Sequence, residues 1–188
     1  MSTPLRLVLA SASPRRRELL AQAGYAFDVH VADVDESRYE GELPQDYVRR
    51  LALKKVRAVA DSQPDAIVLG ADTTVVCESK VLNKPRDLDE AERMLRLLSG
   101  RVHQVHTGLA VILGERAASL VETTYVTFRE IREPELRNYL ASGDPLDKAG
   151  AYGIQGYAAR WIPRIEGDYF NVVGLPIAAV VKLINSLG

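Results

Sequence analysis

Short apolar segments alternate with helical segments along this chain, and this order restricts the fold more than any other feature. Residues 5–10 (LRLVLA) and 66–76 (AIVLGADTTVV) have the apolar character of buried strands, the second interrupted by Gly-Ala-Asp. Residues 27–34 (FDVHVADV) alternate apolar and polar side chains, as a half-buried strand does. Strands alternating with helices predict an α/β protein, in which helices cover a sheet.

The helices are indicated by their ends as well as by their periodicity. Ser13 and Pro14 are typical of a helix start, and Gly24 can end that first helix. Asp87 can cap another, with Glu90 completing a capping box. Further helices are expected from Pro44 to about Ala60, from Pro134 to Gly143, and over residues 175–187.

A hairpin distinguishes this chain from a purely parallel α/β protein. Residues 103–114 and 120–130 predict two strands that turn at 114–115. Because hairpin strands are antiparallel, we expect an α/β fold with a mixed twisted sheet and flanking helices. Residues 144–175 are rich in glycine and lack periodicity, and such a long irregular segment is usually functional. No linker or repeat divides residues 1–188, which we interpret as one domain.

Charge and composition argue against nucleic-acid and membrane partners. The formal net charge is −1, so an anion site must be a local cluster of Arg and Lys. Aromatic residues make up 6% and the tyrosines are scattered, unlike the stacking platforms of single-strand binders. No apolar run reaches the length of a membrane span. The single cysteine, Cys77, fits a strand position and a reducing compartment, so we expect a cytoplasmic protein.

One lysine occupies the apolar face of the helix at 44–60. That face is formed by Tyr47, Val48, Leu51, Ala52, Ala58 and Val59. Four other cations fall outside it, as solvated charges should: Arg49, Arg50, Lys54 and Arg57. Lys55 lies near the middle of the apolar face, and there it must either extend its amine to water or serve a buried anion.

Three successive arginines stand at the start of the first helix, where unpaired N–H groups and the helix dipole favour anions. Arg16 shares the inward face with Leu19 and Leu20, whereas Arg15 and Arg17 flank it. Arg16 therefore suits either a phosphate or a buried structural ion pair.

Asp72 follows Gly70 in an apolar strand, where an acid is costly unless it binds metal or acts as a base. The alternative is a turn aspartate bonded to its own backbone. His103 and His106 fall on opposite faces of one strand and cannot chelate a metal together. No Walker A, dinucleotide, zinc or Ser-His-Asp pattern is present.

Seven segments in register resemble the Maf family of nucleoside triphosphate pyrophosphatases over essentially the whole chain. They are LVLASASPRRRELL, DES, LALKKVRAV, VLGADTTVV, VLNKPRD, the pattern ML..LSG..H.V.TG, and DKAGAYGIQG. The resemblance implies a Maf/ITPase-like fold with two lobes around a central cleft, and a divalent metal, Mg²⁺ or Mn²⁺. It implies hydrolysis of a nucleoside triphosphate to the monophosphate and pyrophosphate. GAYGIQG looks like the branch that acts on dTTP and UTP.

The resemblance also carries roles to single residues. Asp72 matches the family's catalytic acid, as base, metal ligand or both, and Glu36 matches an acidic position and second metal ligand. The positions that match substrate specificity are Arg15, Thr73 and Gln155. The positions that match phosphate contacts are Arg16, Lys55 and Lys84.

Two other functions were weighed against this enzyme. A nucleotide-binding regulator of cell division and septum formation would keep the basic residues but would not need Asp72. A nucleic-acid module using PRRR would require more basic surface than this chain offers. We therefore expect a nucleoside triphosphate as substrate, dTTP and UTP or a modified pyrimidine nucleotide, and the family resemblance suggests a homodimer.

Overall fold

The structure is a computed structural model that describes residues 6–187, so Leu5 of the first predicted strand lies outside the described part. Its sheet has the order β2-β1-β3-β5-β6-β7, and β4 pairs with β3. The strands are β1 (Arg6–Leu9), β2 (Asp28–Val29), β3 (Ala66–Cys77), β4 (Lys80–Leu82), β5 (Val102–Leu113), β6 (Arg116–Thr127) and β7 (Arg164–Glu166). β1 runs parallel to β2 and β3, whereas β4 and β7 pair antiparallel, which confirms the mixed sheet.

The chain forms two compact units. The first comprises the described residues up to Asp72, Thr107–Glu122, and the chain from Gly174 on; the second comprises Thr73–His106 and Thr123–Val173. Two units agree with the two lobes that the family resemblance implies, and the cleft between the lobes stays a prediction.

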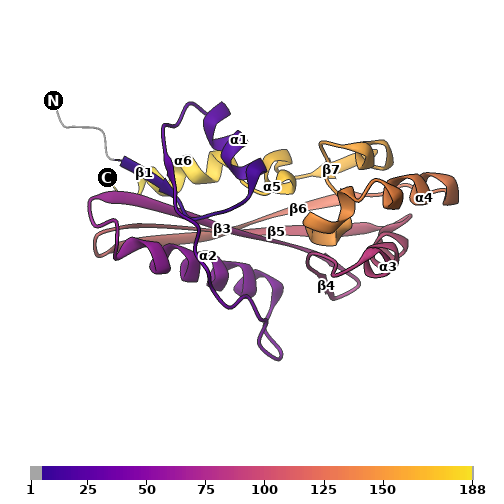
Figure 1. Ribbon diagram of the computed structural model, residues 1–188, viewed down its shortest axis with the longest axis horizontal. Helices are drawn as coiled ribbons and strands as arrows, with labels where there is room; N and C mark the ends of the chain where they lie inside the picture. Colours follow the sequence, from indigo (N-terminus) through magenta and orange to yellow (C-terminus); the bar gives the residue numbers. More distant parts are fainter. Residues whose placement is uncertain (1–5, 188) are drawn as a thin grey trace. The chain divides into compact units, whose positions relative to one another are not determined.

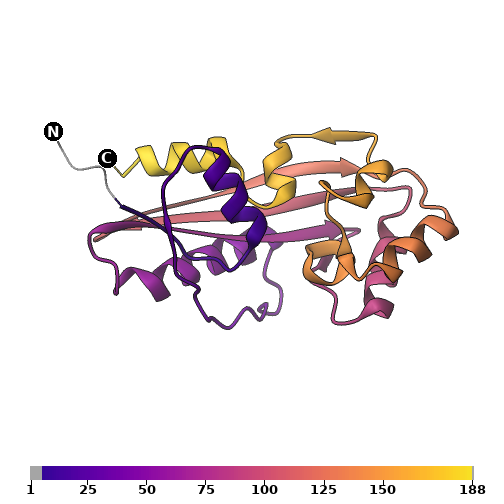
Figure 2. The ribbon, with the colours of Figure 1, turned by 45° about the horizontal axis from the view of Figure 1, so that its top comes forward.

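In the first unit, helices cover both faces of the strands. α1 (Pro14–Gln22) and α6 (Ile177–Asn185) lie on one face, and α2 (Pro44–Ala60) lies on the other (Figures 1 and 2). The α2 side has a core of small and β-branched residues: Val8, Ala10, Ala52, Val56, Val59, Ala66, Val68, Ala110 and Ile112. Such a core lets a helix approach a sheet closely.

The second unit packs short elements around aromatic residues. Its helices are α3 (Leu88–Leu98), α4 (Glu133–Ala141) and α5 (Tyr169–Val173), with 3₁₀ turns η1 (Asp144–Asp147), η2 (Ala149–Ala151) and η3 (Tyr157–Trp161). Phe128, Tyr139 and Trp161 are almost fully buried among them. No helix within residues 6–187 is long and apolar enough to span a membrane.

The histidines of β5 and the cysteine of β3 are structural. His103 Nε2 forms a hydrogen bond of 2.7 Å with the hydroxyl of Tyr152. Burial lowers the pKa of His103 to about 3, so its ring is neutral. His106 instead bonds Thr123 Oγ1 at 2.9 Å, which confirms that the two histidines do not act together. Cys77 is buried in β3, and burial raises the pKa of its thiol, as expected for a strand residue.

Several predicted elements are confirmed. α2 has the predicted bounds, and β5 and β6 form the hairpin turning at 114–115. Ser13 caps α1, with Pro14 in its first turn. The segment 144–175, expected to be irregular, contains the short turns of the second unit, β7 and α5.

Three local predictions are wrong, each for a physical reason. The strand expected over 27–34 shrinks to β2 at the sheet edge, because its partner β1 ends at Leu9 and leaves the later residues exposed. β3 is not interrupted at 70–72 but runs through. The capping box at α3 is incomplete: Asp87 accepts the N–H of Glu90, but Glu90 accepts the N–H of Arg86 instead of reaching back to Asp87.

Two glycines allow α2 to approach the sheet. A Cβ on Gly70 of β3 would lie 2.6 Å from Val56 Cγ1, and one on Gly108 of β5 would lie 2.2 Å from the carbonyl oxygen of Val48. The glycine in Gly-Ala-Asp therefore serves the contact between helix and sheet and does not make a turn.

Replacing Gly108 with alanine should loosen this contact. We expect Gly108→Ala to lower the free energy of unfolding by on the order of 3 kcal/mol, because helix backbone cannot rotate away from the new methyl group. Gly114→Ala in the same hairpin is the control. Gly114 has φ +56° and open space around it, so the control should cost only backbone strain of about 1 kcal/mol. Equal losses in chemical denaturation would contradict the close approach.

Candidate functional site

Lys55 forms the centre of an ionic cluster in the first unit that is buried at Lys55 and Asp72 and exposed at Glu36. Its side chain is buried, and Nζ donates to Asp72 Oδ1 at 2.6 Å. The same ammonium lies 2.7 Å from Glu36 Oε1. Of the two interpretations of this residue, the buried anion is therefore correct, and the anion in this structure is carboxylate from the chain itself.

Asp72 lies in β3, two residues after Gly70, where the strand packs against α2. Burial raises the pKa of its carboxyl, while the charges of Lys55 and Arg16 act in the opposite direction. Its carboxylate binds a lysine and lies within a continuous strand, so it is not a turn aspartate bonded to its own backbone. A carboxylate held ionised in a poorly solvated place is more basic than an exposed one, which suits a proton acceptor.

Arg16 is fixed by neutral acceptors at the start of α1. Nε donates to the carbonyl of Gly174 at 2.9 Å, and Nη1 donates to the carbonyl of Ala71 at 2.8 Å and to Ser11 Oγ at 3.2 Å. Burial lowers the pKa of Arg16 and the charge of Asp72 raises it, and a guanidinium remains charged at neutral pH. Because these three acceptors carry no net charge, they orient the guanidinium without neutralising it.

The neighbouring arginines differ in exposure along α1. Arg17 is exposed, whereas Arg15 is partly buried. Arg15 is close enough for its charge to lower the pKa of Arg16. Two arginines therefore add positive charge at the helix start, where the helix dipole is also positive.

Glu36 belongs to the loop at 30–43, which has no helix or strand. The Tyr47 hydroxyl of α2 donates to the Glu36 carbonyl at 2.9 Å, and Lys54 Nζ donates to the Asp35 carbonyl at 2.9 Å. Arg50 forms two hydrogen bonds with Glu42, of 2.6 and 2.8 Å. The loop is thus attached to α2 along its length, and the Glu36 carboxylate is held toward Lys55.

The remaining candidates belong to the second unit. Thr73 follows Asp72 in β3, Lys84 is exposed just after β4, and Gln155 is exposed in the turn between η2 and η3. The structure therefore brings together Arg16, Glu36, Lys55 and Asp72. The placement of Lys84 and Gln155 beside them stays a prediction.

Sequence reasoning missed two supporting residues. Ser11 is buried and accepts from Arg16, and its only sequence signal is a small polar residue just before the helix cap. Lys148 fixes the loop that carries Gln155 by donating to the Asp144 carbonyl and to the carboxylates of Asp144 and Asp147. A Cβ on Gly153 would lie 2.9 Å from Lys148 Cε, so the glycine lets the loop close over the lysine stem.

The carboxylates of Glu36 and Asp72 are the groups that could hold a metal. Within residues 6–187, no group of three or more His, Cys, Asp or Glu side chains is placed to hold an ion. Mg²⁺ is commonly held by one or two carboxylates together with water and substrate phosphates. Both carboxylates contact the Lys55 ammonium, so they lie close enough together to share an ion, and they do not make a complete metal cage.

Comparisons with known proteins give consistent results over the whole described chain. A family model described as "Maf-like protein" matches residues 6–187. The chain is 50% identical over 186 residues to a "dTTP/UTP pyrophosphatase" of Vibrio parahaemolyticus, covering 98% of each sequence. It is 54% identical to a relative of that description from Moorella thermoacetica, covering 97% of this chain and 95% of the relative. A third, from Koribacter versatilis, is 51% identical over 97% and 94%.

Replacing Lys55 should leave the Asp72 carboxylate buried with less compensating charge. We expect Lys55→Met to lower the free energy of unfolding by about 3–5 kcal/mol in metal-free buffer. The double variant Lys55→Met/Asp72→Asn should recover most of this loss, because it removes the buried charge as well. Chemical denaturation of the three proteins measures both effects. A double variant no more stable than Lys55→Met would contradict the pairing.

The same variant should show a distinctive pH dependence. The pKa of Asp72 is already raised on folding, and removing Lys55 raises it further. The folded state then keeps a proton that the unfolded chain has released, so stability falls as pH rises from the ordinary aspartate pKa to the raised one. As pH rises above the ordinary aspartate pKa of about 4, Lys55→Met should therefore lose more stability than the wild type. Parallel curves would contradict this assignment.

Proposed function

Because the chain belongs to the Maf family, we propose that it is a nucleoside triphosphate pyrophosphatase that hydrolyses dTTP and UTP to the monophosphate and pyrophosphate. The observation that carries the site assignment is the buried Asp72 carboxylate. It accepts a hydrogen bond from Lys55, and the positive charge of Arg16 is close enough to lower its pKa. This arrangement offers a base and two cations in one poorly solvated place, and these groups suit the hydrolysis of a phosphoanhydride bond.

Asp72 acts as the proton acceptor. It takes a proton from water as the water oxygen bonds to the α-phosphorus, and the bond from that phosphorus to the bridging oxygen breaks. Pyrophosphate leaves with the electron pair of the broken bond. Lys55 holds the Asp72 carboxylate in one orientation by its 2.6 Å hydrogen bond, so the acceptor oxygen is positioned before substrate binds.

Charge balance supports a divalent cation at this site. The two cations Lys55 and Arg16 are matched by the two carboxylates of Glu36 and Asp72, so the cluster is neutral overall. A bound Mg²⁺ or Mn²⁺ would supply the further positive charge that stabilises a triphosphate and its leaving group. Glu36 and Asp72 would hold it. Arg15 and Lys84 would add positive charge along the phosphates.

Specificity for the base is assigned to the loop with Gln155, together with Arg15 and Thr73. Uracil and thymine present an N3–H donor between two carbonyl acceptors. An amide can match one donor and one acceptor of that edge. The clamp formed by Lys148 on Asp144 and Asp147 supports the loop in one conformation, which a selective amide needs.

We further propose that the protein works in the cytoplasm as a homodimer, on free dTTP and UTP or on a modified pyrimidine nucleotide. The formal charge of −1 and the scattered aromatic residues support a free nucleotide over nucleic acid, and no membrane partner is proposed. The homodimer is supported by family resemblance alone.

Asp72→Asn should keep the fold and lose turnover. Loss of a general base costs about 10²–10⁴-fold in kcat. The measurement is pyrophosphate release from UTP, with circular dichroism to verify folding and Asp65→Asn, an exposed carboxylate, as the control. Near-normal kcat in Asp72→Asn would overturn the assignment. Absence of pyrophosphate release from the wild-type protein would favour the non-catalytic regulator instead.

Gln155→Ala should narrow the preference among bases. The wild type should prefer UTP and dTTP over CTP, ATP and GTP, and the variant should lose about 1–3 kcal/mol of that discrimination, because a polar edge of the base is left unpaired. The readout is kcat/KM for the five nucleotides. Gln22→Ala, at an exposed position ending α1, is the control. An unchanged preference would show that Gln155 does not read the base.

A further inference from the structure

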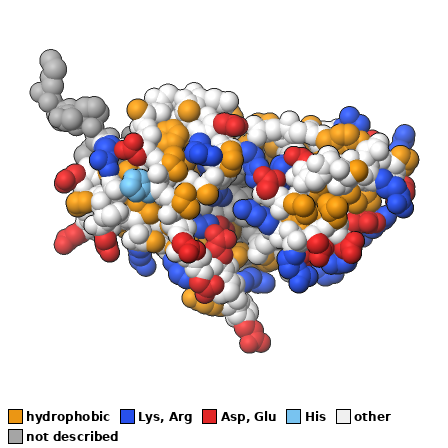
Figure 3. All heavy atoms as spheres, in the orientation of Figure 1, with side chains coloured by type: hydrophobic (Ala, Val, Ile, Leu, Met, Phe, Trp, Pro, Cys, Tyr) orange, Lys and Arg blue, Asp and Glu red, His pale blue; other side chains and the backbone are white. Residues whose placement is uncertain are grey.

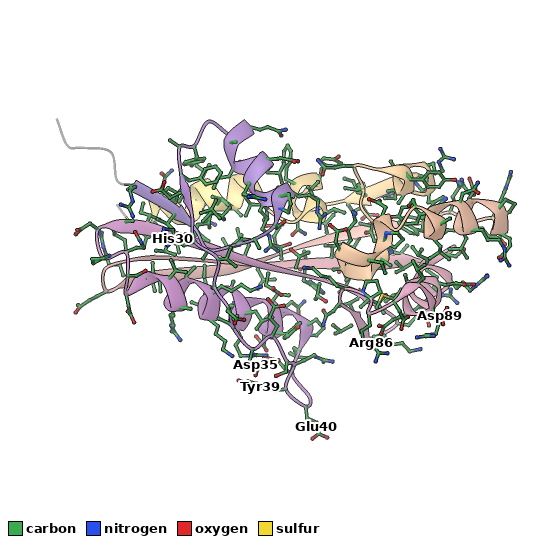
Figure 4. All side chains as sticks on the ribbon, in the orientation of Figure 1. His30, Asp35, Tyr39, Glu40, Arg86 and Asp89 are labelled. Atoms are coloured by element: carbon green, nitrogen blue, oxygen red, sulfur yellow. The ribbon has the colours of Figure 1, made fainter. Side chains whose placement is uncertain are left out.

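A second basic site lies on the face of α2 that points away from Lys55. A pocket of about 330 Å³ is lined there by Tyr39, Asp46, Arg49, Arg50, Leu53, Lys54 and Arg57. We call it the α2 pocket. It shares no lining residue with the cluster of Arg16, Glu36, Lys55 and Asp72, so it is a separate site. Figure 4 shows Asp35 and Tyr39 on the loop beside α2, and Figure 3 shows blue Lys and Arg side chains beside that loop.

The charges of this pocket are only partly compensated. Arg50 is neutralised by its two hydrogen bonds to Glu42 and stacks on the Tyr39 ring at 3.9 Å. Lys54 donates to the Asp35 carbonyl, which orients its ammonium but brings no negative charge.

The other two cations of the α2 pocket have no partner at all among residues 6–187. Arg49 and Arg57 are exposed, and neither forms a hydrogen bond or an ion pair with a described residue. Asp46 is the single carboxylate of the lining. Three cations, Arg49, Lys54 and Arg57, therefore share one acid.

This excess of positive charge destabilises α2. Lys54 lies four residues after Arg50 and three before Arg57, and like charges at these spacings repel on a helix surface. Two exposed arginines of other helices are compensated, Arg96 by Glu92 and Glu133 and Arg137 by Glu133, whereas Arg93 of α3 forms no ion pair with a described residue. What distinguishes α2 is that three cations without a carboxylate partner line one pocket. The uncompensated group on α2 thus points to an anion from outside the chain.

The shape and lining narrow the class of anion. The volume lies in the range of pockets for small organic molecules and exceeds what a single phosphate fills. Tyr39 and Leu53 give the pocket an aromatic ring and an aliphatic wall beside the cations. We propose that the α2 pocket binds a free nucleotide, with its phosphates among Arg49, Lys54 and Arg57 and its base or sugar against Tyr39 and Leu53. This inference goes beyond the proposed function and does not depend on it.

Arginine modification with phenylglyoxal, followed residue by residue by mass spectrometry, reads this pocket directly. The probe is the α,β-methylene analogue of UTP in metal-free buffer, and the reference is Arg93, an exposed arginine of α3. The analogue should protect Arg49 and Arg57 and leave Arg93 reactive, whereas uridine should protect none. Failure to protect Arg49 and Arg57 would overturn the proposal. Equal protection by pyrophosphate would also overturn it, because Tyr39 and Leu53 would then have no role.

Variants separate this pocket from the candidate active site. Arg49→Gln/Arg57→Gln should weaken analogue binding at one of two sites by on the order of tenfold or more, because two charged contacts are lost. Arg93→Gln should retain both sites. Equilibrium dialysis gives the number of sites and the affinity of each. If the double variant kept two unaltered sites, the proposal would be contradicted. It would also be contradicted if a single-stranded oligonucleotide or an acidic peptide protected Arg49 and Arg57 more strongly than the UTP analogue does.

Discussion

The buried hydrogen bond between Lys55 and Asp72 is the interaction on which the rest of the first unit depends. A carboxylate inside an apolar strand is costly, and a lysine on the apolar face of a helix is costly too. Each becomes tolerable only when α2 lies close enough to β3 for the two to meet at 2.6 Å. Gly70 and Gly108 permit that approach. Packing and chemistry are therefore set by the same few positions.

The two faces of α2 use positive charge in different ways. On the inner face, Lys55 is paired with Glu36 and Asp72. On the outer face, Arg49 and Arg57 are exposed to solvent, where dissolved salt screens their charge and an anion is bound more weakly. One helix thus carries both a buried, paired cation and a group of exposed cations.

Local signals predicted the elements well, and contacts distant in sequence were harder to foresee. The bounds of α2 and the cap of α1 follow from proline, serine and periodicity, and the position of Lys55 on an apolar face identified it as unusual. Its partner was not predictable, because pairing with Asp72 depends on how a helix packs against a strand. The short β2 was missed since strand length depends on the partner strand, which ends at Leu9. Lys84 and Gln155 were predicted from family resemblance alone, because exposed loop residues leave no periodic signal.

The attachment of the 30–43 loop to α2 has a thermodynamic consequence. Tyr47, Arg50 and Lys54 hold the loop at three points, and Lys55 holds Glu36 itself. The entropic cost of ordering the Glu36 backbone is therefore met during folding and not when substrate binds. Binding free energy from the triphosphate then remains available for the reacting phosphorus, which is the benefit of a preorganised acidic group.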